Sequence, residues 1–225
     1  IHKPDIPLRP ITSSRDSPTD KLSKYLLKIL LPLQGQSSSY VKNSAHFIDV
    51  LKNIEINEIQ SILVSFDVES LYTNVPLEES LNIAKERLLS DTSLKDRTSL
   101  SVEAIMELLG CCLNNSYFRV EDNFYLQMDG LPMGSSLSPI MANIYMEWFE
   151  EKALRTSEYK QKIWLRYVDD TFIIWENGMD QLKHFFKHIN GINKNINFTM
   201  ELEKDSSIPF LDVFVAWQNK NLNTS

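Results

Sequence analysis

Apolar residues recur with helical spacing along several stretches of the chain, and we expect a helix in each. Leu22, Leu26 and Ile29 lie on one face of a helix that follows Ser17-Pro18 and ends near Leu31, since serine caps a helix and proline fits its first turn. Further helices are expected over residues 40–53, from Pro76 past Leu88, from Ser101 to about Leu113, from Ser135 to about Leu154, and over residues 179–190.

Alternating or continuous apolar runs predict strands between these helices. The run 61–66 indicates a mostly buried strand that ends at Asp67. Further strands are expected as a hairpin over 117–120 and 124–127, an aromatic-rich hairpin over 163–175, and strands over 196–203 and 210–217. Because helices and strands interleave, we expect an α+β fold: a split βαβ arrangement, with an antiparallel sheet like that of an RNA-recognition motif and helices on one face.

Composition limits the class of protein. A chain of 225 residues with 43% hydrophobic content buries a sizeable core. It has no run of about 18 apolar residues, so we expect no membrane association. Cys111 and Cys112, the only cysteines, are adjacent in a predicted helix, which suits neither a disulfide framework nor a zinc site. We interpret both as small core residues of an intracellular protein.

The net charge of −7 counts against a nucleic-acid partner, because phosphate-binding surfaces concentrate lysine and arginine. Two considerations answer this objection. A metal-dependent site must itself be acidic, and the chain looks incomplete at both ends. We therefore expect the basic surface to lie in missing parts of the protein.

Two adjacent aspartates, Asp169 and Asp170, join the apolar strands of the 163–175 hairpin. A two-residue hairpin turn favours Asn-Gly or Asp-Gly, because its central residues take positive φ. Adjacent carboxylates also repel each other unless a cation lies nearby. The alternative is a solvated acidic turn, since aspartate tolerates turn conformations.

Asp67 repeats this pattern at the end of the apolar strand 61–66, although aspartate is depleted in strands. If the two strands are neighbours, Asp67 and Asp169 meet at one edge of the sheet. Their oxygens would then suit two Mg²⁺ ions about 3.5–4 Å apart, the arrangement for phosphoryl transfer to a 3′-hydroxyl. Taken alone, Asp67 is equally an ordinary capping or strand-end aspartate.

The loop 130–139 places two glycines before a helix that begins with hydroxyl residues and a proline. Glycines allow close backbone approach, and a helix N-terminus attracts phosphate. Such loops are also common between ordinary secondary-structure elements. This segment therefore supports a functional site only in combination with the aspartates.

Taken in order, these three segments resemble the motifs of reverse transcriptases, in particular those of Penelope-like retroelements. Residues 65–76 resemble motif A, residues 130–139 motif B, and Arg166–Asp170 the Y-x-D-D motif C. The resemblance extends over nearly the whole chain, through residues 196–203 and 208–213 (motifs D and E) and through residues 8–11 and 17–19 (the end of the fingers).

The resemblance implies a role for each matching residue. Asp67 and Asp169 would be the principal ligands of Mg²⁺, for which Mn²⁺ is an alternative. Asp170 would be a third carboxylate of weaker or indirect coordination, and the carbonyl of Val68 would add an oxygen.

Five further residues would serve the nucleotide. Tyr72 falls where these enzymes place an aromatic gate against a 2′-hydroxyl, and Arg9 where a fingers arginine contacts the triphosphate. Met133, in place of the glutamine that many relatives carry, and Gly134 would lie beside the nucleotide. Lys204 is a candidate general acid for pyrophosphate, although it is equally an ordinary surface lysine.

The same resemblance predicts domains and partners. Residues 1–60 would be partial fingers, residues 61–217 the palm with an insertion over 77–128, and residues 218–225 the start of a thumb or a linker. The expected partners are an RNA template, a DNA primer and deoxynucleotides, in the nucleus. The rest of the fingers, the thumb and a GIY-YIG endonuclease are expected in the full protein.

We therefore expect an RNA-directed DNA polymerase. The alternative is a catalytically inactive or co-opted relative that binds nucleic acid or protein, and a nuclease or phosphatase is disfavoured because Tyr72 would then have no sugar to discriminate. His184 and His188 share a helix face but lack a third ligand, so we interpret them as packing residues. Glu150 and Glu151 are interpreted as a solvated helix face.

Overall fold

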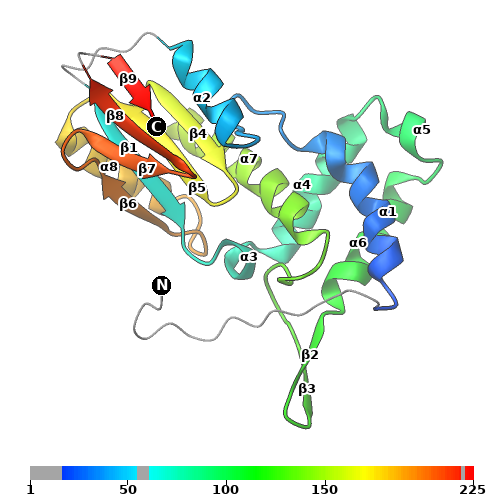
Figure 1. Cartoon of the computed structure of the whole chain (residues 1–225). Helices are drawn as coiled ribbons and strands as arrows, with labels where there is room; N and C mark the ends of the chain where they lie inside the picture. The colour runs from blue at the N-terminus through cyan, green and yellow to red at the C-terminus, as the bar shows by residue number, and fades with distance from the viewer. Residues whose placement is uncertain (1–16, 55–60, 219–220) are drawn as a thin grey trace. The chain divides into compact units, whose positions relative to one another are not determined.

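The computed structural model describes residues 17–54, 61–218 and 221–225, so Arg9 lies outside the described residues. The chain divides into two compact units. Of the described residues, one unit comprises 17–33 and 72–142, and the other comprises 34–54, 61–71, 143–218 and 221–225. Figure 1 shows the order of the elements along the chain. No helix among the described residues is long and apolar enough to cross a membrane.

The first unit is mostly helical. Its helix α6 (Val102–Asn114) contacts both α1 (Asp20–Leu30) and α4 (Leu77–Ser90). Three short helices lie next to these along the chain: η1 (Leu31–Leu33) follows α1, α3 (Leu71–Asn74) precedes α4, and α5 (Leu94–Arg97) lies between α4 and α6. Ser101 begins α6 as predicted, because its side chain accepts a hydrogen bond from the amide of Ala104. The helix expected to start at Ser17-Pro18 instead begins at Asp20.

A hairpin of β2 (Tyr117–Val120) and β3 (Asn123–Leu126) follows α6, at the predicted place. Its side chains are largely exposed to solvent. The chain then enters α7 (Ser138–Thr156), a helix that runs from the first unit into the second.

The second unit is built on an antiparallel sheet of four strands in the order β4-β5-β1-β6. The strands are β1 (Ile62–Val68), β4 (Ile163–Tyr167), β5 (Asp170–Trp175) and β6 (Phe198–Leu202). Strand β1 lies between β5 and β6 and pairs with both. The crossover from β5 to β6 passes through α8 (Met179–Asn190), which is the split βαβ connection that the sequence predicts.

Helices α7 and α8 supply the predicted helical layer on one face of this sheet. Phe66 of β1 packs against Phe185 and Phe186 of α8 and against Trp164 of β4. Phe149 of α7 reaches the ring of Phe198 in β6 at 5.6 Å. Because successive side chains of a strand alternate between faces, the neighbours of Phe66 point to the opposite face.

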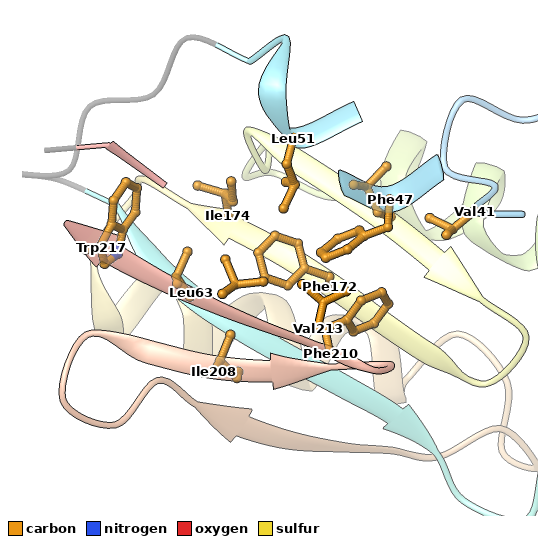
Figure 2. Close-up of a cluster of buried hydrophobic side chains, with 12 residues drawn as sticks. Val41, Phe47, Leu51, Leu63, Phe172, Ile174, Ile208, Phe210, Val213 and Trp217 are labelled. Atoms are coloured by element: carbon orange, nitrogen blue, oxygen red, sulfur yellow. The ribbon is translucent and has the colours of Figure 1, made fainter. Parts of the chain in front are cut away.

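That opposite face is also covered, by helix α2 (Ser44–Lys52) and a second sheet of three strands (Figures 1 and 2). The small sheet consists of β7 (Ser207–Phe210), β8 (Val213–Gln218) and β9 (Asn221–Thr224). Phe172 of β5 is fully buried between Phe47 of α2 and Phe210 of β7, with ring centroids 5.1 and 5.6 Å away. The sheet is therefore the middle layer of three.

Three further sequence predictions were wrong in detail. The strand expected over 210–217 is two strands, because Leu211 takes a φ of 54° and turns the chain between β7 and β8. The helix expected over 40–53 begins only at Ser44, where the side chain of Asn43 caps the amide of His46. Cys111 is exposed, whereas Cys112 is buried as expected. The boundaries of fingers and palm stay a prediction.

Candidate active site

The turn between β4 and β5 consists of Val168 and Asp169, because Tyr167 and Asp170 already pair across the hairpin. The sequence predicted a turn centred on Asp169 and Asp170, so the turn lies one residue earlier. Val168 has a φ of 55°, a left-handed conformation that a β-branched residue rarely adopts. The backbone is therefore strained immediately before Asp169.

Asp67 and Asp170 occupy directly opposite positions of β1 and β5. Directly opposite residues of an antiparallel pair point to the same face, with Cβ atoms about 4.5–5.5 Å apart. This face is the one turned away from Phe66 and α8. The two strands are neighbours, which is the condition on which the sequence argument depended, and their pairing brings Asp67 and Asp170 together at the strand ends next to Asp169.

The three carboxylates affect one another electrostatically. Burial, together with the negative charges of Asp169 and Asp67, raises the pKa of Asp170 from 3.8 to about 6. A carboxylate with this pKa holds its proton about 100-fold more tightly than an ordinary one. The edge of the sheet is thus an environment in which added positive charge is favourable.

The three carboxylates supply the donor chemistry that a divalent metal ion prefers. Among the described residues, no three acidic, histidine or cysteine side chains are gathered closely enough to hold a metal ion. Aspartate side chains swing between staggered rotamers, so the backbone register decides whether three of them are able to converge. Hard carboxylate oxygens on one face of one sheet edge are a donor set suited to Mg²⁺.

Backbone hydrogen bonds tie the turn to β1. The amide of Val68 donates to the carbonyl of Asp169 at 3.2 Å, next to the Asp67–Asp170 pair. Val68 itself is buried and pairs with Phe198 of β6. The strand end that carries Asp67 is therefore fixed on both sides.

In the first unit, the loop after β3 packs against α3. The amide of Leu131 donates to the carbonyl of Tyr72 at 2.6 Å. Gly130 has a φ of 77°, and a Cβ atom at this position would lie 2.6 Å from the carbonyl oxygen of Thr73. Only glycine permits this approach, so Gly130 is what allows the loop to reach Tyr72.

Met133 and Gly134 follow on the same loop, and Gly134 has a φ of 115°. Tyr72, Met133 and Gly134 thus belong to one unit, and Leu131 and Tyr72 join the two segments that carry them. Their contacts with a nucleotide stay a prediction, as does that of Arg9.

Residues 1–209 match the family model described as reverse transcriptase (RNA-dependent DNA polymerase). The chain belongs to the reverse transcriptase family. Both the aspartate edge and the loop 130–139 lie within the matched residues. No curated protein matches the chain.

Solved structures with the same fold include polymerases of two kinds. Telomerase from Candida tropicalis, truncated from the C-terminal domain, matches with a TM-score of 0.66 and 18% identity over 94% of this chain and 46% of that one. Telomerase from Candida albicans, in complex with a fragment of telomeric RNA, matches with a TM-score of 0.69 and 14% identity over 94% of this chain and 38% of that one. The RNA-dependent RNA polymerase of BmCPV matches with a TM-score of 0.63 and 13% identity, covering 94% of this chain and 20% of that one.

These likenesses confirm the α+β palm fold expected of a reverse transcriptase. The chain spans less than half the length of the telomerases that it matches. At these levels of identity the comparison concerns the fold alone.

Lys204 does not lie with the carboxylates of this reverse transcriptase domain. It follows Glu203, whose amide donates to the carbonyl of Leu63 just beyond the end of β6, whereas Asp67 pairs with Thr199 near the start of β6. Leu63 and Asp67 are four residues apart on β1, about 13 Å at the usual rise of a strand. The side chain of Lys204 is 83% exposed and pairs with Glu201, so we leave it out of the proposed site.

Sequence reasoning missed a buried network behind the Asp169 turn. Glu150 was interpreted as part of a solvated helix face, but only 2% of its side chain is exposed, and it binds Arg166 of β4. The sequence of β4 did contain a signal that Arg166 is buried: side chains alternate along a strand, so Arg166 lies on the same face as Trp164, which is buried. His188 packs as expected, with its Nε2 atom 3.0 Å from the carbonyl of Ala153, whereas His184 is exposed.

Proposed function

We propose that this chain is the catalytic core of a reverse transcriptase, which adds deoxynucleotides to the 3′ end of a DNA primer on an RNA template. The observation that carries the proposal is the register of β1 and β5, which sets Asp67 opposite Asp170 and beside Asp169. Membership of the reverse transcriptase family supplies the reaction class. The motif resemblance favours a Penelope-like retroelement as the source and the nucleus as the place of action.

Asp67 and Asp169 would hold the metal ions, with Asp170 as a third carboxylate and the carbonyl of Val68 as a further oxygen. Two Mg²⁺ ions, or Mn²⁺, would supply activation of the primer hydroxyl and neutralisation of charge on the phosphates. The chain's own contribution is to hold acidic oxygens in place. Asp170, whose pKa is raised to about 6, would be the carboxylate most relieved by a nearby cation.

Tyr72 would exclude ribonucleotides by contact with the 2′-hydroxyl, and Met133 and Gly134 would line the nucleotide. Arg9 would bind the triphosphate with its planar guanidinium. The bond between Leu131 and Tyr72 supports a shared role for the two segments. The fold is shared with a telomerase that was solved with a telomeric RNA fragment. A DNA primer with a free 3′ end is therefore a suitable first substrate to test.

The test is primer extension on an RNA template with Mg²⁺ and deoxynucleotides, in the protein that carries this chain. Asp169→Asn should lower extension about 100-fold or more, the scale on which single electrostatic groups contribute to catalysis. Asp122→Asn is the matched control, because Asp122 is also a turn aspartate and its side chain is 95% exposed.

Equal loss of extension in both variants would show that the effect is not specific to the proposed site. A wild-type protein that binds primer and template but extends nothing in Mg²⁺ or Mn²⁺ would reject the polymerase proposal. The co-opted binding protein would then be the better account.

A further inference from the structure

Arg166 is a charged residue in the interior of the second unit. It lies in β4 on the face that α7 covers, opposite Thr171 of β5, and its side chain is fully buried. Burial of an unpaired guanidinium would cost several kcal/mol. The surrounding residues must therefore compensate its charge.

Glu150 of α7 provides the compensating charge. Its Oε1 atom accepts hydrogen bonds from Arg166 Nε at 2.8 Å and from Trp164 Nε1 at 2.7 Å. Its other oxygen accepts from the Ser39 hydroxyl at 2.8 Å. Glu150 is thus held by three donors and fixes the orientation of the guanidinium.

The other arm of the guanidinium reaches the aspartate turn. Arg166 Nη1 donates to the carbonyl of Val168 at 2.9 Å and to Asn143 Oδ1 at 3.0 Å. Val168 is the turn residue with a φ of 55°, and its carbonyl belongs to the peptide bond between Val168 and Asp169. The peptide bond that leaves Asp169 is held by the amide of Val68. Both carbonyls that flank the Asp169 side chain are therefore restrained.

We propose that Arg166, oriented by Glu150, is a positioning residue for the Asp169 carboxylate in metal binding and catalysis. The inference rests on the proposed function, because it needs Asp169 to be a metal ligand. The guanidinium fork is what the role requires: one arm pairs with Glu150 while another holds the turn. A lysine has a single charged nitrogen and lacks this fixed fork.

A purely stabilising ion pair is the competing account, and two observations weigh against it. Replacing a buried ion pair with apolar residues is often neutral or stabilising, so stability alone is a poor reason to keep one. In addition, Arg166 Nη2 has no hydrogen-bond partner within the described part of the chain. The bond to a strained turn is the feature that a stabilising pair would not need.

The experiment separates position from stability by changing both partners at once. Arg166→Met alone would leave Glu150 buried and unpaired, and the protein would then risk unfolding. In Arg166→Met combined with Glu150→Gln no charge is left uncompensated, and the glutamine carbonyl still accepts from Trp164. Arg155→Met, at an exposed position of α7, is the matched control for loss of an arginine, and Asp169→Asn is the reference for loss of a ligand.

Four quantities are measured: the melting temperature, the affinity for Mn²⁺ by electron paramagnetic resonance, and kcat and KM of primer extension. The double variant should melt near the wild-type temperature, bind Mn²⁺ about 10- to 100-fold more weakly, and lose kcat in the same range with KM for deoxynucleotide unchanged. This is the usual effect of removing a partner that orients a metal ligand. Arg166→Lys should also melt near the wild-type temperature and bind Mn²⁺ more weakly.

Wild-type Mn²⁺ affinity in the double variant would overturn the inference, as would full rescue by lysine. A wild-type protein that binds Mn²⁺ through Asp169 but does not extend primers would reject the polymerase and leave the positioning role measurable through Mn²⁺ affinity. A wild-type protein that binds no Mn²⁺ would reject both.

Discussion

The hairpins β4–β5 and β2–β3 are both closed by two-residue turns whose first residue has positive φ, 55° at Val168 and 54° at Glu121. In both hairpins an aspartate occupies the second turn position. Their backbones are therefore similar where the chain reverses. They differ in what surrounds the strands.

The strands of β4–β5 are covered on both faces. Helices α7 and α8 cover one face, and helix α2 and the small sheet, through Phe47 and Phe210, cover the other. The β2–β3 hairpin leaves most of its aromatic side chains in solvent, and Phe124 is 74% exposed. A two-stranded hairpin alone is only marginally stable. Because the two turns have similar geometry, the comparison indicates that the Val168-Asp169 turn is stabilised by the layers that cover its strands.

The largest effect should come from removing one aromatic ring from each hairpin. Phe172→Ala should lower the free energy of unfolding by about 3–5 kcal/mol, because it opens a cavity among fully buried rings. Phe124→Ala should change it by less than about 0.5 kcal/mol, because the ring faces solvent. Urea unfolding of both variants checks the pair.

A large loss in Phe124→Ala would break the comparison, because it would mean that something covers the β2–β3 hairpin in solution. A small loss in Phe172→Ala would mean that the three-layer packing around β5 is looser than the structure shows. Far-ultraviolet circular dichroism of each variant is the control for a retained fold.

Apolar and alternating runs predicted both hairpins. They could not predict that β2–β3 is exposed, because Tyr117 and Phe124 satisfy the same alternation as Trp164 and Phe172. Whether a strand is covered depends on residues distant in sequence. The candidate site shows the same limit: Asp67 and Asp169 stood out as acidic strand ends, and the alternation of β4 could have indicated that Arg166 is buried, but its partner Glu150 could not be identified without the packing of α7 on β4.

The second effect concerns aspartates at or next to the turns of the two hairpins. The pKa of Asp170 is raised from 3.8 to about 6, so the folded protein binds this proton more tightly than the unfolded chain does. The free energy of unfolding should therefore fall as the pH rises from about 4 to about 6, and the penalty should persist above pH 6. Asp170→Asn should remove that pH dependence in chelator-containing buffer.

At pH 7.5 we expect Asp170→Asn to be more stable than wild type by about 1–2 kcal/mol, a value reduced for partial solvent screening. Asp122→Asn, at the exposed turn, should change the free energy of unfolding by less than about 0.5 kcal/mol. Urea titrations at pH 4, 5, 6 and 7.5 test both variants. An unchanged slope in Asp170→Asn would show that burial and the neighbouring carboxylates do not affect Asp170 in solution.

A smaller effect is expected from relieving the strained turn residues. Val168→Gly should raise the free energy of unfolding by about 1 kcal/mol, because glycine adopts positive φ without strain, less its entropic cost. Glu121→Gly should be nearly neutral, since an unbranched residue pays less for this conformation. Thermal melts compare the two. A Val168→Gly protein less stable than wild type would show that packing of the valine outweighs its strain.

The smallest effect should come from the arginine of the exposed hairpin. Arg119 pairs with Asp122 at 2.6 Å and lies 5.8 Å from the centre of the Phe124 ring, but its side chain is 58% exposed. Solvent weakens such pairs, so Arg119→Ala should lower the free energy of unfolding by less than about 0.5 kcal/mol. Added salt should erase even that difference, because exposed charges are screened. A loss that survives 1 M salt would mean that Arg119, like Arg166, acts in an environment shielded from water, and the two hairpins would then be more alike than their exposure indicates.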